Sequence, residues 1–249
     1  MNGLIAHGAP PAYFTFPRLA ARGLPHATTT RHCPGVASPA DPAGPFDPGA
    51  AVALGRAGLD LSRVTYARQV HGANVGAAPP GGGLAGSADV LATTDRGVPL
   101  AIFTADCLAV TLWDAEAEVL AVAHVGWRGT VKGAAQAAVR AAEALGARAG
   151  RMAAAISPSI GPCCYEVDDP VIAALTAAYP SASEQWFAPA RPGRLMLDLW
   201  HANETLLAEA GVDSGRIENP RLCTACHPDL LYSYRRGLSG RLVTVAALP

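Results

Sequence analysis

The chain is short of charge, and above all of lysine. Only 16% of its 249 residues are charged, Lys132 is the single lysine, and the net charge is −1. Binding of nucleic acid usually relies on a clustered basic surface, so this composition argues against nucleic acid as a partner. Half of the residues are hydrophobic, which excludes a disordered chain and provides a substantial core. The length fits one large domain or two small ones, and we expect a single domain over residues 1–249 that acts as a monomer.

Long apolar runs are also missing. The most apolar stretch, residues 98–125, is interrupted by four acidic residues between positions 106 and 118, so we do not expect it to span a membrane. The first eleven residues have neither the basic start nor the apolar segment of a signal peptide. These features predict a cytoplasmic protein without membrane contact. In that setting the six cysteines favour metal binding, redox chemistry or burial over disulfides.

Short strands and a few helices alternate along the chain. Apolar runs bounded by breakers predict strands at 64–70, 88–93, 98–104, 108–113, 118–124, 153–157, 230–234 and 241–248. Helical spacing and capping residues predict helices from Gly129 to Gly146, from Asp168 to Tyr179 and from Asp198 to Gly211. Residues 34–49 and 79–83, rich in proline and glycine, predict loops. Together these elements indicate a mixed α/β domain.

Three of the predicted strands end at a potential metal ligand. His71 follows the strand at 64–70, Cys107 comes shortly after 98–104, and His124 ends 118–124. Side chains at strand ends can converge on one point, and two imidazoles with one thiolate would suit zinc, leaving a fourth position for water or substrate. Each residue taken alone is equally compatible with an ordinary buried or hydrogen-bonded side chain, and the spacings match no zinc finger.

A candidate anion site lies directly after His124. Residues Trp127-Arg128-Gly129-Thr130 open a predicted helix, and the unpaired amides of a helix N-terminus attract anions. Arg128 adds a forked cation suited to phosphate. In the competing interpretation Thr130 only caps the helix and Arg128 points into solvent.

Five motifs, taken in order, resemble one known family. They are Gln69-Val70-His71-Gly72, Ala105-Asp106-Cys107-Leu108, His124-Val125-Gly126-Trp127-Arg128-Gly129, Ile160-Gly161-Pro162-Cys163-Cys164-Tyr165-Glu166-Val167 and Ser233-Tyr234-Arg235-Arg236. The chain resembles the bacterial polyphenol oxidase, or laccase-domain, family, whose members are viewed mainly as zinc-dependent purine nucleoside phosphorylases with adenosine deaminase activity. The resemblance runs from about residue 64 to the C-terminus. It fails near the front, where residues 31–38 replace the family's Gly-Gly-Val-Ser element and no Asn-Leu follows.

The resemblance implies a four-layer α/β/β/α sandwich with mixed sheets, related to cysteine hydrolases. It places the zinc ligands, which we also take as catalytic, on His71, Cys107 and His124. It implies phosphorolysis of adenosine, inosine and methylthioadenosine, so purine nucleosides and phosphate are the expected partners. We assign Arg128 to phosphate and Tyr165 to stacking on the purine.

The same residues allow other chemistry. Cys107 could be a thiolate nucleophile with His124 as its base, as in cysteine hydrolases. Copper could replace zinc and oxidise phenols, although seven histidines are few for a multicopper laccase. A closed structural zinc site in a binding protein would need a fourth protein ligand. Asp106, beside Cys107, is either a proton-transfer group or an ordinary turn carboxylate.

The remaining cysteines fit weaker patterns. The segment from Cys223 to His227 matches a c-type haem attachment motif, and its cysteines could equally form a redox pair or a second zinc site. Cys163 and Cys164 are neighbours whose side chains would face opposite ways in an extended chain, so we do not expect them to share a metal. The Arg235-Arg236 pair could reach an anionic substrate, but we interpret it as a solvated strand end.

Overall fold

Two mixed β-sheets lie face to face in the computed structural model, which describes residues 3–37 and 44–249. The first sheet has the order β1 (Ile5–Gly8), β2 (Pro11–Thr15), β3 (His26–Thr29), β16 (Leu242–Ala246), β8 (Leu100–Thr104), β4 (Thr65–Arg68) and β6 (Gly83–Ser87). The second has the order β15 (Ile217–Glu218), β11 (Ala153–Ile156), β9 (Leu108–Asp114), β10 (Val119–Val125), β7 (Val90–Thr93) and β5 (Val75–Ala77). A small third sheet contains β12 (Glu166–Val167), β14 (Leu195–Leu197) and β13 (Phe187–Pro189).

The helices are short. The α-helices are α1 (Pro17–Ala21), α2 (Pro48–Gly55), α3 (Trp127–Val131), α4 (Ala134–Ala144), α5 (Asp169–Ala178) and α6 (Leu199–Glu209). Single 3-10 turns lie at η1 (Leu61–Arg63), η2 (Ala149–Arg151), η3 (Ser183–Trp186), η4 (Ser214–Arg216) and η5 (Thr224–Cys226). No helix among the described residues is long and apolar enough to cross a membrane.

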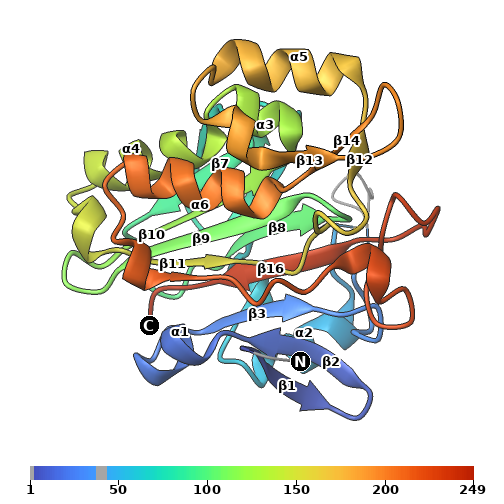
Figure 1. Ribbon diagram of the computed structural model, residues 1–249. Coiled ribbons are helices and arrows are strands. Elements are labelled where there is room, and N and C mark those ends of the chain that lie inside the picture. Colours follow the sequence, from blue (N-terminus) through green and yellow to red (C-terminus); the bar gives the residue numbers. More distant parts are fainter. Residues whose placement is uncertain (1–2, 38–43) are drawn as a thin grey trace.

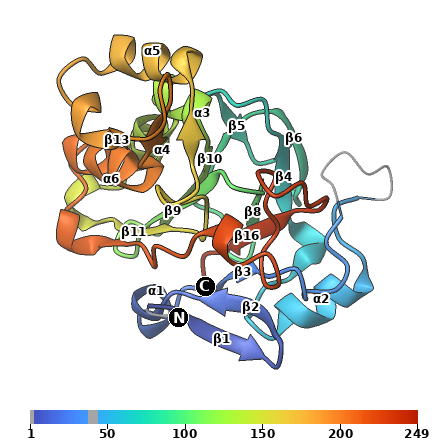
Figure 2. The same cartoon turned by 45° about the vertical axis from the view of Figure 1, so that its right-hand side comes forward.

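Alternation along the central strands produces four layers. Leu100 and Ile102 of β8 belong to the same buried cluster as Leu120 of β10, so this cluster fills the space between the two sheets. The opposite face of β8 packs on α2, and the opposite face of β10 packs on α4 and α6. Figures 1 and 2 show α4 and α6 on one side of the paired sheets and α2 on the other. The expected four-layer α/β/β/α sandwich is confirmed.

The central strands are buried on both faces, which explains their nearly continuous apolar sequences. Every residue of β8, β9 and β10 is buried. Strand β4 pairs in parallel with β8, whereas β16 pairs with β8 in the antiparallel sense, so the first sheet is mixed as expected. Sheets covered on both sides tolerate such runs because neither face has to be polar.

Two of the predicted elements are wrong. The helix expected from Gly129 to Gly146 is two helices, because Gly133 adopts a left-handed conformation (φ 75°) between α3 and α4. The strand expected at 230–234 is a turn, since the amides of Leu230 and Leu231 both donate to the His227 carbonyl. Of the loop expected at 34–49, residues 38–43 lie outside the described residues, and α2 begins within it at Pro48. The strands β1, β2 and β3 were not predicted.

Candidate metal centre and pocket

The three ligand candidates come from different parts of the two sheets. His71 follows β4 of the first sheet, Cys107 lies where the chain passes from β8 to β9 of the second sheet, and His124 lies on β10. The structure brings all three together, with ligating atoms within 4.8 Å of one another. The two imidazole rings meet edge to face, their centroids 4.8 Å apart. The predicted convergence at strand ends is therefore found.

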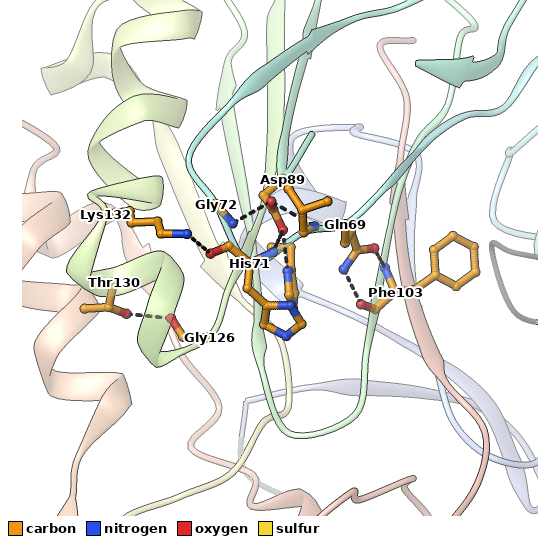
Figure 3. Close-up of polar contacts among 10 residues, drawn as sticks. Gln69, His71, Gly72, Asp89, Phe103, Gly126, Thr130 and Lys132 are labelled. Carbon is orange, nitrogen blue, oxygen red and sulfur yellow. Dashed lines mark hydrogen bonds and ion pairs between the residues drawn. The ribbon is translucent and has the colours of Figure 1, made fainter. Parts of the chain in front are cut away.

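Hydrogen bonds fix the backbone around His71. Beyond the end of β4, the Gln69 side chain donates to the carbonyl of Phe103 at 2.7 Å and accepts from its amide at 2.8 Å, which continues the pairing with β8 (Figure 3). His71 itself is left-handed, with φ 56°, a conformation that needs support from its surroundings. Lys132 provides part of it by donating to the His71 carbonyl at 3.1 Å.

Asp89, which was not predicted as a site residue, connects two of the ligand candidates. Its carboxylate is fully buried and accepts from the backbone amides of His71 (3.0 Å) and Gly72 (2.7 Å) and from His124 Nδ1 (2.8 Å). A further bond comes from the amide of Val70. Figure 3 shows the carboxylate at the centre of these donors. Because Nδ1 of His124 bonds to Asp89, its Nε2 is the nitrogen left for a ligand, the arrangement typical of metal-binding histidines.

The charges of the site favour the thiolate form of Cys107. Burial raises the pKa of Cys107, but hydrogen bonds from His124 and His71 outweigh it and bring the pKa to about 7. Burial likewise opposes the charge on His124, yet its bonds to Asp89 and Cys107 raise its pKa to about 9. A thiolate is the form of cysteine that binds metals and attacks electrophiles.

Gly126 leaves the space that the site needs. A Cβ atom at this position would lie 2.7 Å from Cys107 Sγ and 3.7 Å from Cδ2 of His71. A side chain there would push directly into the ligand group. Two imidazoles, one thiolate and this clearance fit a zinc ion with an open coordination position.

The ligand group opens into a large pocket. Its volume is about 1090 Å³, near the upper end of the range for small-molecule sites. Six arginines line it: Arg68, Arg128, Arg191, Arg194, Arg235 and Arg241. Arg191 and Arg194 are paired with Glu166 and Asp168. The pocket therefore carries excess positive charge, which suits an anionic substrate.

Arg128 and Tyr165, the two residues assigned to substrate, both line this pocket. The Arg128 guanidinium lies 4.3 Å from the centre of the Trp127 ring, and it has no carboxylate partner within residues 3–37 and 44–249. Thr130 does not cap α3; it is buried and bonds to the Gly126 carbonyl. Arg128 is solvent-exposed, as the competing interpretation held, but at the pocket wall.

Arg235 lies over the Tyr165 ring and bonds to the backbone on both sides of it. Its guanidinium lies 5.3 Å from the Tyr165 ring centre and donates to the carbonyls of Cys164 (3.1 Å) and Glu166 (3.0 Å). Arg235 is solvent-exposed, as expected, but it lies in the pocket wall and follows a turn rather than a strand. Burial, with the charge of Cys107, raises the pKa of Tyr165, so its ring is a neutral, flat surface at physiological pH.

Asp106 is a turn carboxylate. Oδ1 accepts from the Thr224 hydroxyl at 2.6 Å, and Oδ2 accepts from the amide of Arg235 at 2.7 Å. Both oxygens are therefore engaged in fastening the C-terminal segment to the Ala105–Cys107 corner. This favours the structural interpretation of Asp106 over proton transfer.

Comparison with known proteins agrees with the geometry. The model of the multi-copper polyphenol oxidoreductase laccase family matches residues 50–249. A purine nucleoside phosphorylase of Deinococcus radiodurans is 42% identical over 201 residues, which are 80% of this chain and 74% of that protein. Adenosine deaminase RL5, from an unknown prokaryotic organism, is 37% identical over 63% of this chain and 60% of its own length. The crystal structure of YlmD from Geobacillus stearothermophilus superposes with a TM-score of 0.85 at 27% identity, covering 98% of this chain and 99% of that one. The chain belongs to the multi-copper polyphenol oxidoreductase laccase family.

Proposed function

We propose that the chain is a zinc-dependent purine nucleoside phosphorylase that acts on adenosine, inosine and methylthioadenosine and also deaminates adenosine. The observation that carries this proposal is the meeting of His71, Cys107 and His124 at the wall of a large pocket rich in arginine. One relative named a purine nucleoside phosphorylase and another named an adenosine deaminase support it. A bound zinc ion would supply a Lewis acid and lower the pKa of a water molecule to about 7.

The chain's own residues would bind and orient the substrates. Phosphorolysis requires an anion at the anomeric carbon while positive charge develops on the sugar. Arg128 is the candidate for phosphate, because its fork of donors suits oxyanions and no carboxylate among the described residues neutralises it. Tyr165, braced by Arg235, offers its face to the purine. Asp89 would keep His124 in one tautomer and orientation.

The test is chromatography of the products from adenosine, with and without phosphate. Phosphate-dependent release of adenine with ribose 1-phosphate is the expected result, and inosine formed without phosphate would demonstrate the deaminase activity. Cys107→Ala should lose both activities together with its pocket zinc. Cys33→Ser, which removes a buried thiol outside the group, is the matched control. Full activity in Cys107→Ala would refute the proposal.

A cysteine hydrolase is the second candidate, and the acidified thiol of Cys107 favours it. With pKa values of about 7 for Cys107 and about 9 for His124, the pair resembles an activated nucleophile with its acid–base partner. A metal on the sulfur would weaken its nucleophilicity, so the two functions compete. Activity that survives a chelator but not a thiol alkylator would select the hydrolase.

Copper-dependent phenol oxidation is disfavoured because few histidines are clustered. Within the described residues only one group of potential ligands contains histidine, and it contains two. Reduction of oxygen to water by a laccase uses several coppers held largely by imidazole. We expect no oxygen uptake when the copper-loaded protein is given a phenol.

A further inference from the structure

Four cysteines gather beside the pocket, separate from the His71 group. This cysteine cluster consists of Cys163, Cys164, Cys223 and Cys226, whose sulfur atoms lie within 4.8 Å of one another. Cys226 Sγ is 3.4 Å from Cys163 Sγ and 3.5 Å from Cys164 Sγ. In a tetrahedral zinc site with Zn–S bonds of about 2.3 Å, the sulfurs stand about 3.8 Å apart. The cluster therefore has the number and the spacing of ligands that zinc requires.

The local backbone explains why adjacent cysteines can face the same point. The amides of Cys164 and Tyr165 both donate to the Gly161 carbonyl, so this segment is a turn and not an extended strand. The expectation that Cys163 and Cys164 face opposite ways is thus wrong, because it assumed an extended chain. The second pair flanks the 3-10 turn η5: Cys223 precedes it and Cys226 ends it, so the turn brings Cys226 back toward Cys223.

Other contacts hold the two turns against each other. Ser159 forms a parallel bridge with Cys223, and the amide of Thr224 donates to the Ser159 carbonyl at 3.0 Å. The amide of Gly161 donates to Cys223 Sγ at 3.2 Å. Amide donors to sulfur are typical of the surroundings of metal-bound thiolates, where they fix the ligand and spread its charge.

The charge of the surroundings also fits. Four thiolates around one Zn²⁺ carry a net charge of about −2, which requires cations nearby. Arg235 donates to the carbonyl of Cys164 at 3.1 Å, and Arg236 donates to the carbonyl of Ala225 at 2.7 Å. Two guanidinium groups therefore bond directly to the two turns that carry the cysteines.

Other uses of these cysteines fit less well. The sulfur of Cys226 is almost equally close to two partners, whereas a disulfide would pair it with one at about 2.05 Å. The four cysteines of an iron–sulfur cluster are divided among two or four irons and as a group spread over a wider space than the sulfurs of one mononuclear site. Thioether links to haem would need Cys223 and Cys226 to face a porphyrin, but both face two further thiols.

We infer that the cysteine cluster is a second metal centre, a tetrathiolate zinc site that fastens the Gly161–Tyr165 turn to η5. Tyr165 directly follows this centre and lines the pocket, so the metal holds one wall of the pocket without touching the substrate. The site is independent of the zinc proposed for His71, Cys107 and His124. Two of its cysteines are exposed, so a metal ion can reach it from solvent.

The experiment measures metal in full-length Cys107→Ala protein, purified with a phosphine reductant and without chelator. This variant removes a ligand of the pocket group and leaves the cysteine cluster intact. Elemental analysis should find one zinc per chain. Replacement of that zinc by Co²⁺ should give the visible bands of a tetrahedral cobalt site, with sulfur-to-cobalt charge transfer from four thiolates.

The controls separate the cluster from the other cysteines. Adding Cys226→Ser or Cys163→Ser, both at exposed positions, to Cys107→Ala should remove the zinc and increase proteolysis within the 161–165 turn, whereas adding Cys33→Ser should leave the zinc in place. Three results would each overturn the inference. They are a Cys107→Ala protein without metal, iron in place of zinc, and zinc that is retained after Cys226→Ser is added. The zinc content and cobalt spectrum of Cys107→Ala itself are measured without any substitution in the cysteine cluster. The test therefore stands even if a cluster variant folds poorly.

Discussion

Replacing Asp89 with asparagine should weaken both the fold and the pocket metal site. The buried carboxylate accepts four N–H donors, two at each oxygen. An amide has only one oxygen, so whichever way it turns, two buried donors lose their acceptor. Each orphaned donor costs about 1–3 kcal/mol, which gives about 2–6 kcal/mol in total. That is a large part of the 5–15 kcal/mol, roughly, that stabilises an ordinary domain.

The metal should respond as well as the fold. Loss of a carboxylate behind a ligating histidine typically lowers metal affinity by about 10–100-fold, equivalent to about 1.4–2.8 kcal/mol. The assay is competition for zinc against a chromophoric chelator on folded protein, with thermal unfolding followed in parallel. Cys107→Ala protein, which keeps the cysteine cluster but lacks a pocket ligand, is measured in the same way. The zinc that it binds is subtracted as the contribution of the cluster.

Asp114→Asn is the matched control for Asp89→Asn. Asp114 is as buried as Asp89 and accepts from the amide of Arg148 and the guanidinium of Arg151, but it lies outside the pocket lining. The Asp114→Asn variant should lose stability but keep its affinity for zinc. If both variants bound zinc equally well, Asp89 would be an ordinary structural carboxylate and the reasoning about His124 would fail.

Three further predictions concern single sites. Gly126→Ala should lower zinc affinity at least about tenfold, measured by the same competition, because its Cβ would lie 2.7 Å from Cys107 Sγ. Burial opposes the charge on Asp114, but the Arg148 amide and Arg151 outweigh it and hold the pKa of this carboxyl below its ordinary value. Its stabilisation is therefore fully present above the pKa of the unfolded chain and is lost as the pH falls through the lowered pKa of the folded state. The unfolding curves of Asp114→Asn and the unsubstituted protein should converge in acid. Tyr165→Phe should keep the KM for adenosine, whereas Tyr165→Ala should raise it about 5- to 150-fold, since stacking on a base contributes about 1–3 kcal/mol.

The three ligand candidates could be picked out from the sequence because each closes an apolar run. His71, Cys107 and His124 interrupt strand-like sequences at the point where a chain leaves the core, and that position is visible without coordinates. Asp89 was missed because its role depends on hydrogen bonds to residues 18 and 35 positions away in the chain. An acidic residue before a strand is common and gives no signal by itself. The cysteine pair at 163–164 was misjudged for a related reason: the turn that sets its direction is made by hydrogen bonds to Gly161.

The N-terminal part of the fold could not be predicted for a different reason. Strand β1 has no buried residue, so it lacks the alternation that marks a half-buried strand. Its place is set by pairing with β2, and β2 in turn reaches the core through β3 and β16. Such edge strands take their structure from the sheet that they extend.

A metal could bind tightly in the pocket only after the two sheets have packed together. One ligand follows a strand of the first sheet, one lies on a strand of the second, and Cys107 lies on the connection between them. Neither sheet alone contains the site, so tight binding must follow the slow, long-range step in which the sheets pack. Metal at about 100 times its Kd would then add about 2.7 kcal/mol to the assembled sandwich and nothing to its separate halves. A cell short of that metal would hold less of this protein as well as less active protein.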